Sequence, residues 1–411
     1  MSHILVDSKP ASAGLGTWIA SRLIALIGMR MVGSPARGAL TIVFPDGHVR
    51  TIGNPVTGFH AKLKLNNFKV IGEAMRRGTV GFAAAYINED IEIDDLTAVF
   101  RFFLENYEQF AEASHGMFKA AAQDIAYHLS RANTKEKAKE NISEHYDLGN
   151  DFYGEWLDSS MTYSSAVFQS GDTGLEAAQR NKYHHVADAA GIKEGEDVLE
   201  IGCGWGGFAE VVARDYNANL KGITLSKEQL KYAVERMERQ GLSNHATLVF
   251  EDYRDTEGQF DHVCSIEMIE AVGEEHWPRY FKTVHDRLKT GGTAAIQAIT
   301  IEEDSFETYK ANPDFIQRYI FPGGMLLTRR AMKEQAERVG MVLESIENFG
   351  KSYAETLRLW RDRFLERWPM IAHLGYDEAF KRKWLYYLSY CEAGFDHGMI
   401  DVGIYKYKKP A

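Results

Sequence analysis

The chain has 411 residues, of which 45% are hydrophobic and 26% charged, and its formal net charge is −11 at pH 7. This length and composition predict two domains and a sizeable hydrophobic core. Its three cysteines, Cys203, Cys264 and Cys391, are few, odd in number and scattered. They argue against a disulfide framework or any metal site and favour a reducing compartment. We interpret Cys203 as a small packing residue.

The amino-terminal segment contains neither a secretory signal nor a good membrane span. Residues 1–14 lack a basic region followed by an apolar core, and the apolar stretch 15–32 contains Arg22 and Arg30. Because the hydrophobic residues of this stretch follow helical spacing, we predict an amphipathic helix. It packs on the protein, which we favour, or lies on a bilayer.

Charge is unevenly distributed along the chain. Residues 1–80 contain ten Lys or Arg against three Asp or Glu, a balance of +7. A basic section on an acidic protein favours contact with an anionic membrane surface, and a merely solvated basic face is the alternative. We find no nucleic-acid recognition motif. The expected location is therefore cytoplasmic, peripheral at the inner membrane surface.

Residues 38–93 are typical of a small α+β unit. The run ALTIVF is followed by the turn Pro45-Asp46-Gly47, which predicts a hairpin because Asp and Gly tolerate the required dihedrals. Asp94 or Asp95 then caps a helix, whose apolar face would hold Leu96, Val99, Phe100, Phe103, Tyr107 and Phe110. The charged run 133–141 indicates a domain junction near residue 135, dividing the chain into 1–135 and 136–411.

The stretch Val198–Glu210, reading VLEIGCGWGGFAE, predicts a strand, a glycine turn and a helix that begins near Phe208. Glycine lets the backbone approach a ligand closely, and helix-start N–H groups point into the crevice. A dinucleotide site needs GxGxxG and an acid about twenty residues later, but here the spacing is GxGxG and residues 220–224 contain no acid. GxGxG with Glu200 just before it is the pattern of S-adenosylmethionine sites.

The region after this turn predicts a parallel sheet with covering helices. The ligand of such a sheet lies beyond the carboxyl ends of the strands, near the switch in strand order. An amphipathic helix is expected at Lys227–Arg239. Further strands are expected at residues 221–224, 247–250, 262–266, 294–299, 342–349 and 402–407.

An aromatic-rich segment, residues 302–322, follows the fifth expected strand and extends into a substrate-roofing insert over 302–330. Because it lies on the ligand side of the sheet, we predict that it roofs an apolar substrate. The alternative is ordinary core packing. Its large apolar residues are Phe306, Tyr309, Phe315, Ile316, Tyr319, Ile320 and Phe321.

Seven blocks in order resemble the cyclopropane fatty acid synthases. The similarity covers most of residues 140–411 and, more weakly, the amino-terminal domain. The blocks are HYDLGNDFYGEWLD (145–158), MTYSSAVF (161–168), VLEIGCGWGGF (198–208), ITLSKEQL (223–230), SIEMIEAVG (265–273), YIFPGG (319–324) and YAETLRLW (353–360).

The resemblance implies a class I methyltransferase fold, a Rossmann-like seven-stranded α/β sheet with a smaller α+β amino-terminal domain and a helical insert over the active site. It implies S-adenosylmethionine as methyl donor, phospholipid acyl chains as substrate and, as in many relatives, a homodimer. Gln229 would bind the ribose in place of an acid, and Asp252 and Tyr253 would lie near the adenine. The other implied cofactor residues are Tyr163, Ser164, Glu200, Gly202, Gly204, Gly206, Thr224 and Leu225.

The resemblance also implies a catalytic anion site. Family members hold bicarbonate as the base, using a Cys, a Glu, a His, a backbone group and a Tyr. Glu270, Tyr353 and the backbone of Ile299 match three of these. Ser165 stands in the Cys position and Gln297 in the His position, and both can still hydrogen-bond an anion.

Glu267 adds a second carboxylate, three residues before Glu270. If both point into the pocket, Glu267 can replace or reposition bicarbonate as the base. The product is then a cyclopropane or a methyl-branched unsaturated chain. In some cyclopropane-forming relatives the His position is also Gln and the block also reads EMxEAVG, so Gln297 and Glu267 alone do not decide between the two products; Ser165 is the stronger departure. Two further hypotheses are a small-molecule methyltransferase on the same fold and a catalytically degenerate lipid-binding relative.

Overall fold

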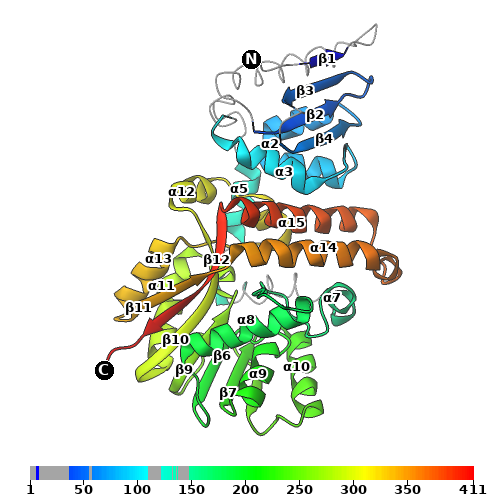
Figure 1. Ribbon diagram of the computed structural model, residues 1–411. Helices are drawn as coiled ribbons and strands as arrows, with labels where there is room; N and C mark the ends of the chain where they lie inside the picture. Colours follow the sequence, from blue (N-terminus) through cyan, green and yellow to red (C-terminus); the bar gives the residue numbers. More distant parts are fainter. Residues whose placement is uncertain are drawn as a thin grey trace. The chain divides into compact units, whose positions relative to one another are not determined.

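The computed structural model describes residues 6–8, 37–54, 58–109, 122–131, 133–135, 137 and 148–411. The chain divides into two compact units (Figure 1). Unit 1 comprises residues 1–127, 311–319 and 375–397, and unit 2 comprises 128–310, 320–374 and 398–411. The expected amphipathic helix at 15–32 lies outside the described residues. Among the described helices, none is long and apolar enough to cross a membrane.

Unit 1 contains a five-stranded sheet in the order β1-β3-β2-β4-β5, in which only the β2–β4 pair is parallel. The predicted hairpin is confirmed: β2 pairs with β3, and the Asp46 carboxylate accepts a hydrogen bond from the His48 N–H at 3.1 Å. The elements are β1 Val6–Ser8, β2 Ala39–Val43, β3 Val49–Gly53, β4 His60–Leu65, β5 Ile91–Ile93, α2 Lys69–Ile87 and α3 Leu96–Glu105; α5, Ala122–Ser130, continues into unit 2.

The capped helix of unit 1 is confirmed, with one difference at its end. The Asp95 side chain caps α3 by accepting the Ala98 N–H at 2.9 Å. The helix ends at Glu105, so Tyr107 lies beyond it and is exposed, and Phe110 falls outside the described residues. Val99 and Phe102 of α3 join the core formed with β2 and β4.

Unit 1 also includes a late segment of the chain, which corrects the expected junction near residue 135. The first break falls at residues 127/128, and helix α15, Glu378–His397, packs on α2 and α3. Tyr386 of α15 contacts Phe100 at a ring-centroid distance of 4.8 Å. Distant parts of the chain complete the aromatic core of unit 1. A single boundary in the sequence therefore does not separate the two units.

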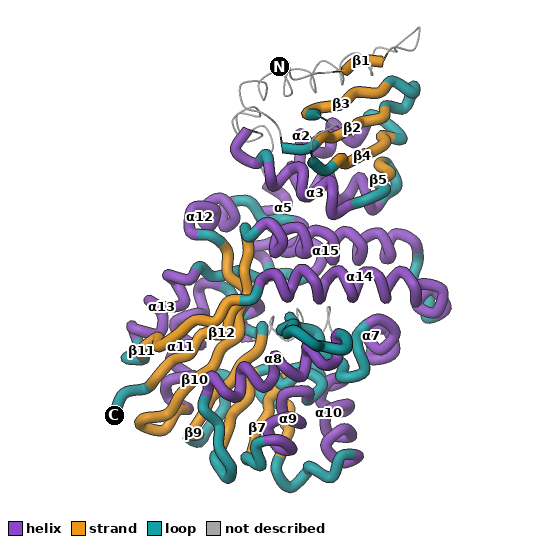
Figure 2. The backbone as a smooth tube through the Cα atoms, viewed as in Figure 1, coloured by secondary structure: helices purple, strands orange, loops and turns teal. Residues whose placement is uncertain are grey.

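Unit 2 contains the expected seven-stranded sheet, in the order β11-β12-β10-β9-β6-β7-β8 (Figure 2). The strands β10, β9, β6, β7 and β8 are parallel, whereas β12 is antiparallel to both neighbours. All seven predicted strands are confirmed. They are β6 Asp197–Ile201, β7 Asn219–Thr224, β8 Ala246–Phe250, β9 Phe260–Ile266, β10 Leu288–Ile301, β11 Val342–Asn348 and β12 Ile400–Lys408.

Helices cover both faces of this sheet, so successive strand residues enter opposite cores. Val198 of β6 packs with α8 and α9, whereas Leu199 packs with α11 and α13. The order along the chain reverses at β6, since β7 and β8 extend to one side and β9 and β10 to the other. The helices are α7 Asn150–Trp156, α8 Leu175–Ala190, α9 Gly207–Asp215, α10 Lys227–Arg239, α11 Trp277–Arg287, α12 Glu303–Ala311, α13 Arg329–Arg338 and α14 Gly350–His373; short turns η1, η2 and η3 span Ile269–Ala271, Glu274–His276 and Ile316–Ile320.

The aromatic insert divides between the two units. Phe306 packs on Trp277 within unit 2, while Phe315 packs on Tyr386 within unit 1 at a ring-centroid distance of 4.4 Å. These contacts correspond to the core-packing alternative for both residues. A roof formed by the other residues of the insert stays a prediction.

Candidate active site

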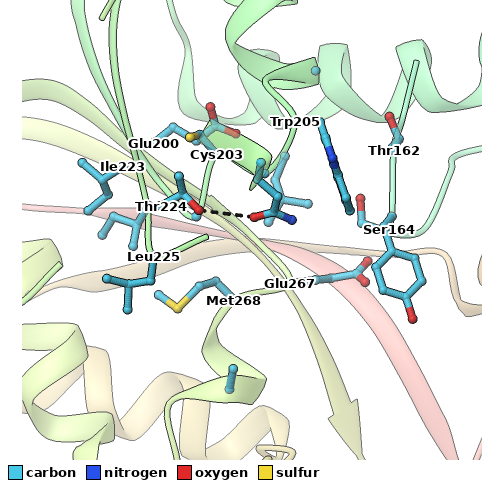
Figure 3. Close-up of a pocket in the computed structure, with 18 of the residues that line it drawn as sticks. Thr162, Ser164, Glu200, Cys203, Trp205, Ile223, Thr224, Leu225, Glu267 and Met268 are labelled. Atoms are coloured by element: carbon cyan, nitrogen blue, oxygen red, sulfur yellow. Dashed lines mark hydrogen bonds between the residues drawn. The ribbon is translucent and has the colours of Figure 1, made fainter. Parts of the chain in front are cut away.

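A cavity opens at the carboxyl ends of β6, β7, β8 and β9 in unit 2 (Figure 3). This is the edge of the sheet where the sequence predicts a ligand. The cavity is lined by the glycine turn after β6, the 161–164 loop, and the residues that follow β7 and β9. Its predicted cofactor residues are Tyr163, Ser164, Glu200, Gly202, Gly204, Thr224, Leu225, Gln229 and Tyr253.

The glycine turn is anchored to the neighbouring strand. The N–H groups of Gly202 and Cys203 both donate to the Ile223 carbonyl at 3.0 Å. Gly202 has φ +87°, and a Cβ there would lie 3.0 Å from the Met268 side chain, so glycine is required on two grounds. Cys203 is buried, and burial raises the pKa of its thiol, in agreement with the packing role.

Gln229 is positioned at the cavity by a capped helix start. Ser226 caps α10 by accepting the Gln229 N–H at 3.2 Å. The Thr224 hydroxyl donates to Gln229 Oε1 at 3.2 Å, drawn as a dashed line in Figure 3. The Gln229 amide is therefore held beside the strand end, as the ribose role predicted for it requires.

Two predicted cofactor residues do not line the cavity. A Cβ on Gly206 would lie 3.1 Å from the Ala233 Cβ, so Gly206 permits close packing of the turn against α10. The Asp252 carboxylate accepts two hydrogen bonds from the Arg254 guanidinium, at 2.8 and 2.7 Å. A direct part in cofactor binding stays a prediction for both.

Glu200 is a buried acid at the end of β6, and its side chain reaches the cavity. Among the described residues, its Oε2 atom has no hydrogen-bond partner. Burial raises the pKa of Glu200 to about 8, against the attraction of Lys182 and Arg236. An unpaired carboxyl oxygen here is suited to a cationic or hydrogen-bonding ligand.

The 161–164 loop packs against a buried aromatic cluster. The Tyr163 ring lies 5.4 Å from Tyr153, 5.6 Å from Trp156 and 5.3 Å from Trp360, between ring centroids. Both tryptophans are fully buried. This packing fixes the loop that carries Tyr163 and Ser164.

Trp360→Ala is expected to destabilise unit 2 by about 3–5 kcal/mol, because it leaves a large cavity beneath Tyr163. It should also weaken binding of S-adenosylhomocysteine, since the Tyr163 ring loses its support. Denaturant unfolding and titration calorimetry measure the two effects. Trp368→Ala is the matched control, because Trp368 is only partly buried; equal losses in both variants would contradict the prediction.

Glu267 lies at the centre of the predicted catalytic residues. Its Oε1 accepts the Ser165 N–H at 2.8 Å and the Gln297 amide at 2.7 Å, and its Oε2 accepts the Tyr353 hydroxyl at 2.7 Å. Burial raises the pKa of Glu267, while Lys182 and these three donors lower it. The carboxylate side chain lines the cavity beside Ser164 (Figure 3).

The backbone at Glu267 is strained. This residue has φ +50°, the left-handed region that non-glycine residues seldom adopt. Its N–H donates to the Gln297 carbonyl at 2.9 Å, which ties the strained residue to β10. Strain of this kind is retained where the surrounding structure over-determines it, typically at functional sites.

Glu270 approaches the same region from the following turn. Its Oε1 accepts the Ile299 N–H at 2.6 Å, and its Oε2 has no partner among the described residues. Burial, and after it the neighbouring Glu267, raise the pKa of Glu270 to about 8. Of the two acids, Glu267 is a carboxylate that accepts three hydrogen bonds, and Glu270 is a carboxyl that tends to stay protonated.

The predicted anion-binding residues are therefore brought together, but Ser165 participates differently from the expectation. Its hydroxyl donates to the Ala166 carbonyl at 2.9 Å, and its backbone N–H reaches Glu267. Sequence reasoning also missed Lys182, a fully buried cation whose ammonium donates to Ser164 Oγ at 2.5 Å. No local motif marks one lysine of an amphipathic helix as buried.

Comparison with known proteins decides the family. A protein-family model described as mycolic acid cyclopropane synthetase matches residues 133–404, about two thirds of the chain. The chain belongs to this family.

Curated relatives and solved structures agree with membership of the cyclopropane synthetase family. The chain is 38% identical to a tuberculostearic acid methyltransferase of Mycobacterium tuberculosis, over 80% of this chain and 78% of the relative. It is 35% identical to the cyclopropane-fatty-acyl-phospholipid synthase of Escherichia coli, over 82% and 84%. A crystal structure of a mycolic acid cyclopropane synthase complexed with SAH and CTAB superposes with a TM-score of 0.62 at 28% identity, covering 66% of this chain and 98% of that one.

These findings confirm the expected fold class, a class I methyltransferase sheet. The protein is an S-adenosylmethionine-dependent methyltransferase of the cyclopropane synthetase family. Its glycine turn, Gln229 and Glu200 line one cavity, and their parts in binding the methyl donor stay predictions. The methyl donor supplies an electrophilic carbon.

Proposed function

We propose that the protein methylates the cis double bond of an unsaturated acyl chain of a phospholipid, and that Glu267 is the base. The substrate class follows the family membership and the names of the relatives. The +7 balance of residues 1–80 supports action at an anionic membrane surface.

One observation carries the assignment of the base: the Glu267 carboxylate occupies the centre of the predicted anion site. Ser165, Gln297 and Tyr353 all donate to it. By resemblance, these are the positions that bind bicarbonate in ring-forming relatives. A carboxylate of the chain itself then takes the place of the free anion, and bicarbonate is not needed.

The proposed reaction balances without any further reagent. The alkene electron pair forms a bond to the methyl carbon as the carbon–sulfur bond of the donor breaks, leaving S-adenosylhomocysteine and a carbocation. Glu267 then accepts a proton from carbon. The buried Glu267 carboxylate stabilises the developing positive charge before that proton is removed.

We further propose that the product is a methyl-branched unsaturated chain. A hydride shift toward the cationic carbon, followed by loss of a proton from the methyl group, leaves a methylene branch. Loss of the same proton before the shift closes a cyclopropane. Three donors hold the Glu267 carboxylate in place, and a base that removes the proton more slowly than the hydride shifts gives the branch. The name of the 38% identical methyltransferase supports the branched product.

Product analysis in cells rich in monounsaturated phospholipid tests this function. We expect acyl chains that are one CH₂ heavier and keep olefinic signals in proton NMR. A donor labelled with a trideuterated methyl group should leave two deuterium atoms if the methyl group loses the proton, and three if a neighbouring carbon loses it. Ring signals without olefinic signals would contradict the branched product, and unmodified lipid from a protein that binds the donor would contradict the enzymatic function.

A further inference from the structure

Lys182 is a buried cation beside the proposed base. It lies on α8, its side chain is fully buried, and its ammonium donates to Ser164 Oγ at 2.5 Å. The ammonium also lies 4.2 Å from the centroid of the Tyr183 ring. A buried lysine is costly unless the surrounding groups compensate its charge, so its neighbours indicate why it is retained.

The charged groups that act on Lys182 come from three separate elements. Glu267 follows β9, Asp158 follows α7, and Glu200 ends β6. Burial lowers the pKa of Lys182 to about 8, while these three carboxylates, Glu267 first, favour its charged form. Lys182 in turn lowers the pKa of both Glu267 and Glu200. The positive charge of Lys182 therefore acts on three acids, of which Glu267 and Glu200 line the cavity.

The same helix also fixes the loop that supplies a donor to the base. Gln179 lies one turn before Lys182, and its amide donates to the Ser164 carbonyl at 2.8 Å. Residues at this spacing lie on one face of a helix, so two side chains of α8 hold Ser164. The next residue, Ser165, donates its N–H to Glu267. Hydrogen bonds to Ser164, the Ser164–Ser165 backbone and the hydrogen bond of Ser165 thus join α8 to the carboxylate.

We propose that Lys182 is a positioning residue that holds Ser164 and, through its buried positive charge, keeps Glu267 ionised so that Glu267 can accept the proton. This inference rests on the proposed role of Glu267 as base.

The positive charge of Lys182 matters for the ionisation of Glu267 because the cavity has an excess of acids. Glu200, Glu267 and Glu270 lie in or around one buried region, where desolvation favours their protonated forms, and at Glu270 repulsion from Glu267 adds to it. A protonated Glu267 has no lone pair suited to taking the proton of the carbocation. The Lys182 charge opposes this effect at Glu267 more strongly than the hydrogen bond from the Tyr353 hydroxyl does.

Lys182→Met and Gln179→Met separate the two parts of the inference. Both variants remove a contact to Ser164, but only the first removes a charge. We expect the acidic limb of the kcat–pH profile to move to higher pH by about one unit in Lys182→Met, lowering kcat about tenfold on that limb. The sign follows because loss of the cation raises the pKa of Glu267. Gln179→Met should lower kcat without moving the limb.

Further variants cover the remaining outcomes. Lys182→Arg should restore the pH profile in part. Lys182→Gln keeps a hydrogen-bond donor without the charge, so it should shift the acidic limb as Lys182→Met does, and it replaces Lys182→Met if the methionine variant does not fold. An unshifted limb in the folded variants would overturn the inference while leaving Glu267 as base. Full activity of Glu267→Gln would instead overturn the proposed function, on which this inference rests.

Discussion

Glu267→Gln is expected to lower kcat by about 10²–10⁴-fold, the range that a positioned general base contributes. Glutamine has nearly the same shape as glutamate, so the contacts to Gln297 and Tyr353 can rearrange around it, but a neutral amide cannot accept the proton. Single-turnover assays on phospholipid vesicles measure the effect. Binding of S-adenosylhomocysteine, measured by calorimetry, should change little, because the cofactor residues stay in place.

Bicarbonate provides the sharper test of this prediction. Wild-type activity should not depend on added bicarbonate, whereas Glu267→Ala opens space among the three donors and should regain part of its activity when bicarbonate is supplied. Glu274→Gln is the matched control, because this exposed acid pairs with Lys310 outside the cavity. Dependence of the wild-type enzyme on bicarbonate would show that Glu267 is not the base.

Glu270→Gln is expected to have two effects of opposite sign. Turnover should fall, because the Glu270 carboxyl accepts the Ile299 N–H beside Glu267, and the amide replaces an oxygen there with an N–H donor that disfavours positive charge. Stability should rise at alkaline pH, because the variant no longer carries an acid whose ionisation the fold disfavours. The pKa of Glu270 is raised from 4.5 to about 8, with burial as the main cause.

The pH dependence follows from the sign of that shift. Below pH 4.5 the carboxyl is protonated in both the folded and unfolded states, so it does not affect their difference. Between that pH and about 8, folding requires the group to keep its proton, and this cost grows to as much as ~5 kcal/mol. Thermal unfolding of Glu270→Gln should therefore show a midpoint above that of wild type at pH 8.5 and close to it at pH 4.5. The same difference in midpoint between variant and wild type at both pH values would contradict the raised pKa of Glu270 as its cause.

Much of unit 2 could be predicted because local patterns determine it. Seven apolar runs became seven strands, and the predicted helix Lys227–Arg239 has the observed bounds, with Ser226 as its cap. The GxGxG turn requires glycine at Gly202 both for its φ of +87° and for the approach of Met268. Such features depend on a few consecutive residues, which the sequence displays directly.

The division into units could not be predicted in the same way. Phe315 and Tyr386 belong to the core of unit 1 although they follow the strands of unit 2 in the chain. The composition of the aromatic insert is equally typical of a segment that covers a substrate and of one that packs in a core. Its packing depends on partners far away in the sequence, and periodicity does not identify those partners.

The sequence by itself determined the methyl donor, because the glycine turn and the seven family blocks are short and specific, and it predicted the residues of the catalytic region. Only the tertiary structure decided that Glu267, rather than Glu270, receives three donors, and that Lys182 is buried next to it. The physical reason is that ionisation depends on burial and on charges brought together from β6, β9, α8 and the 158–165 loop. Those distances arise only when the chain has folded.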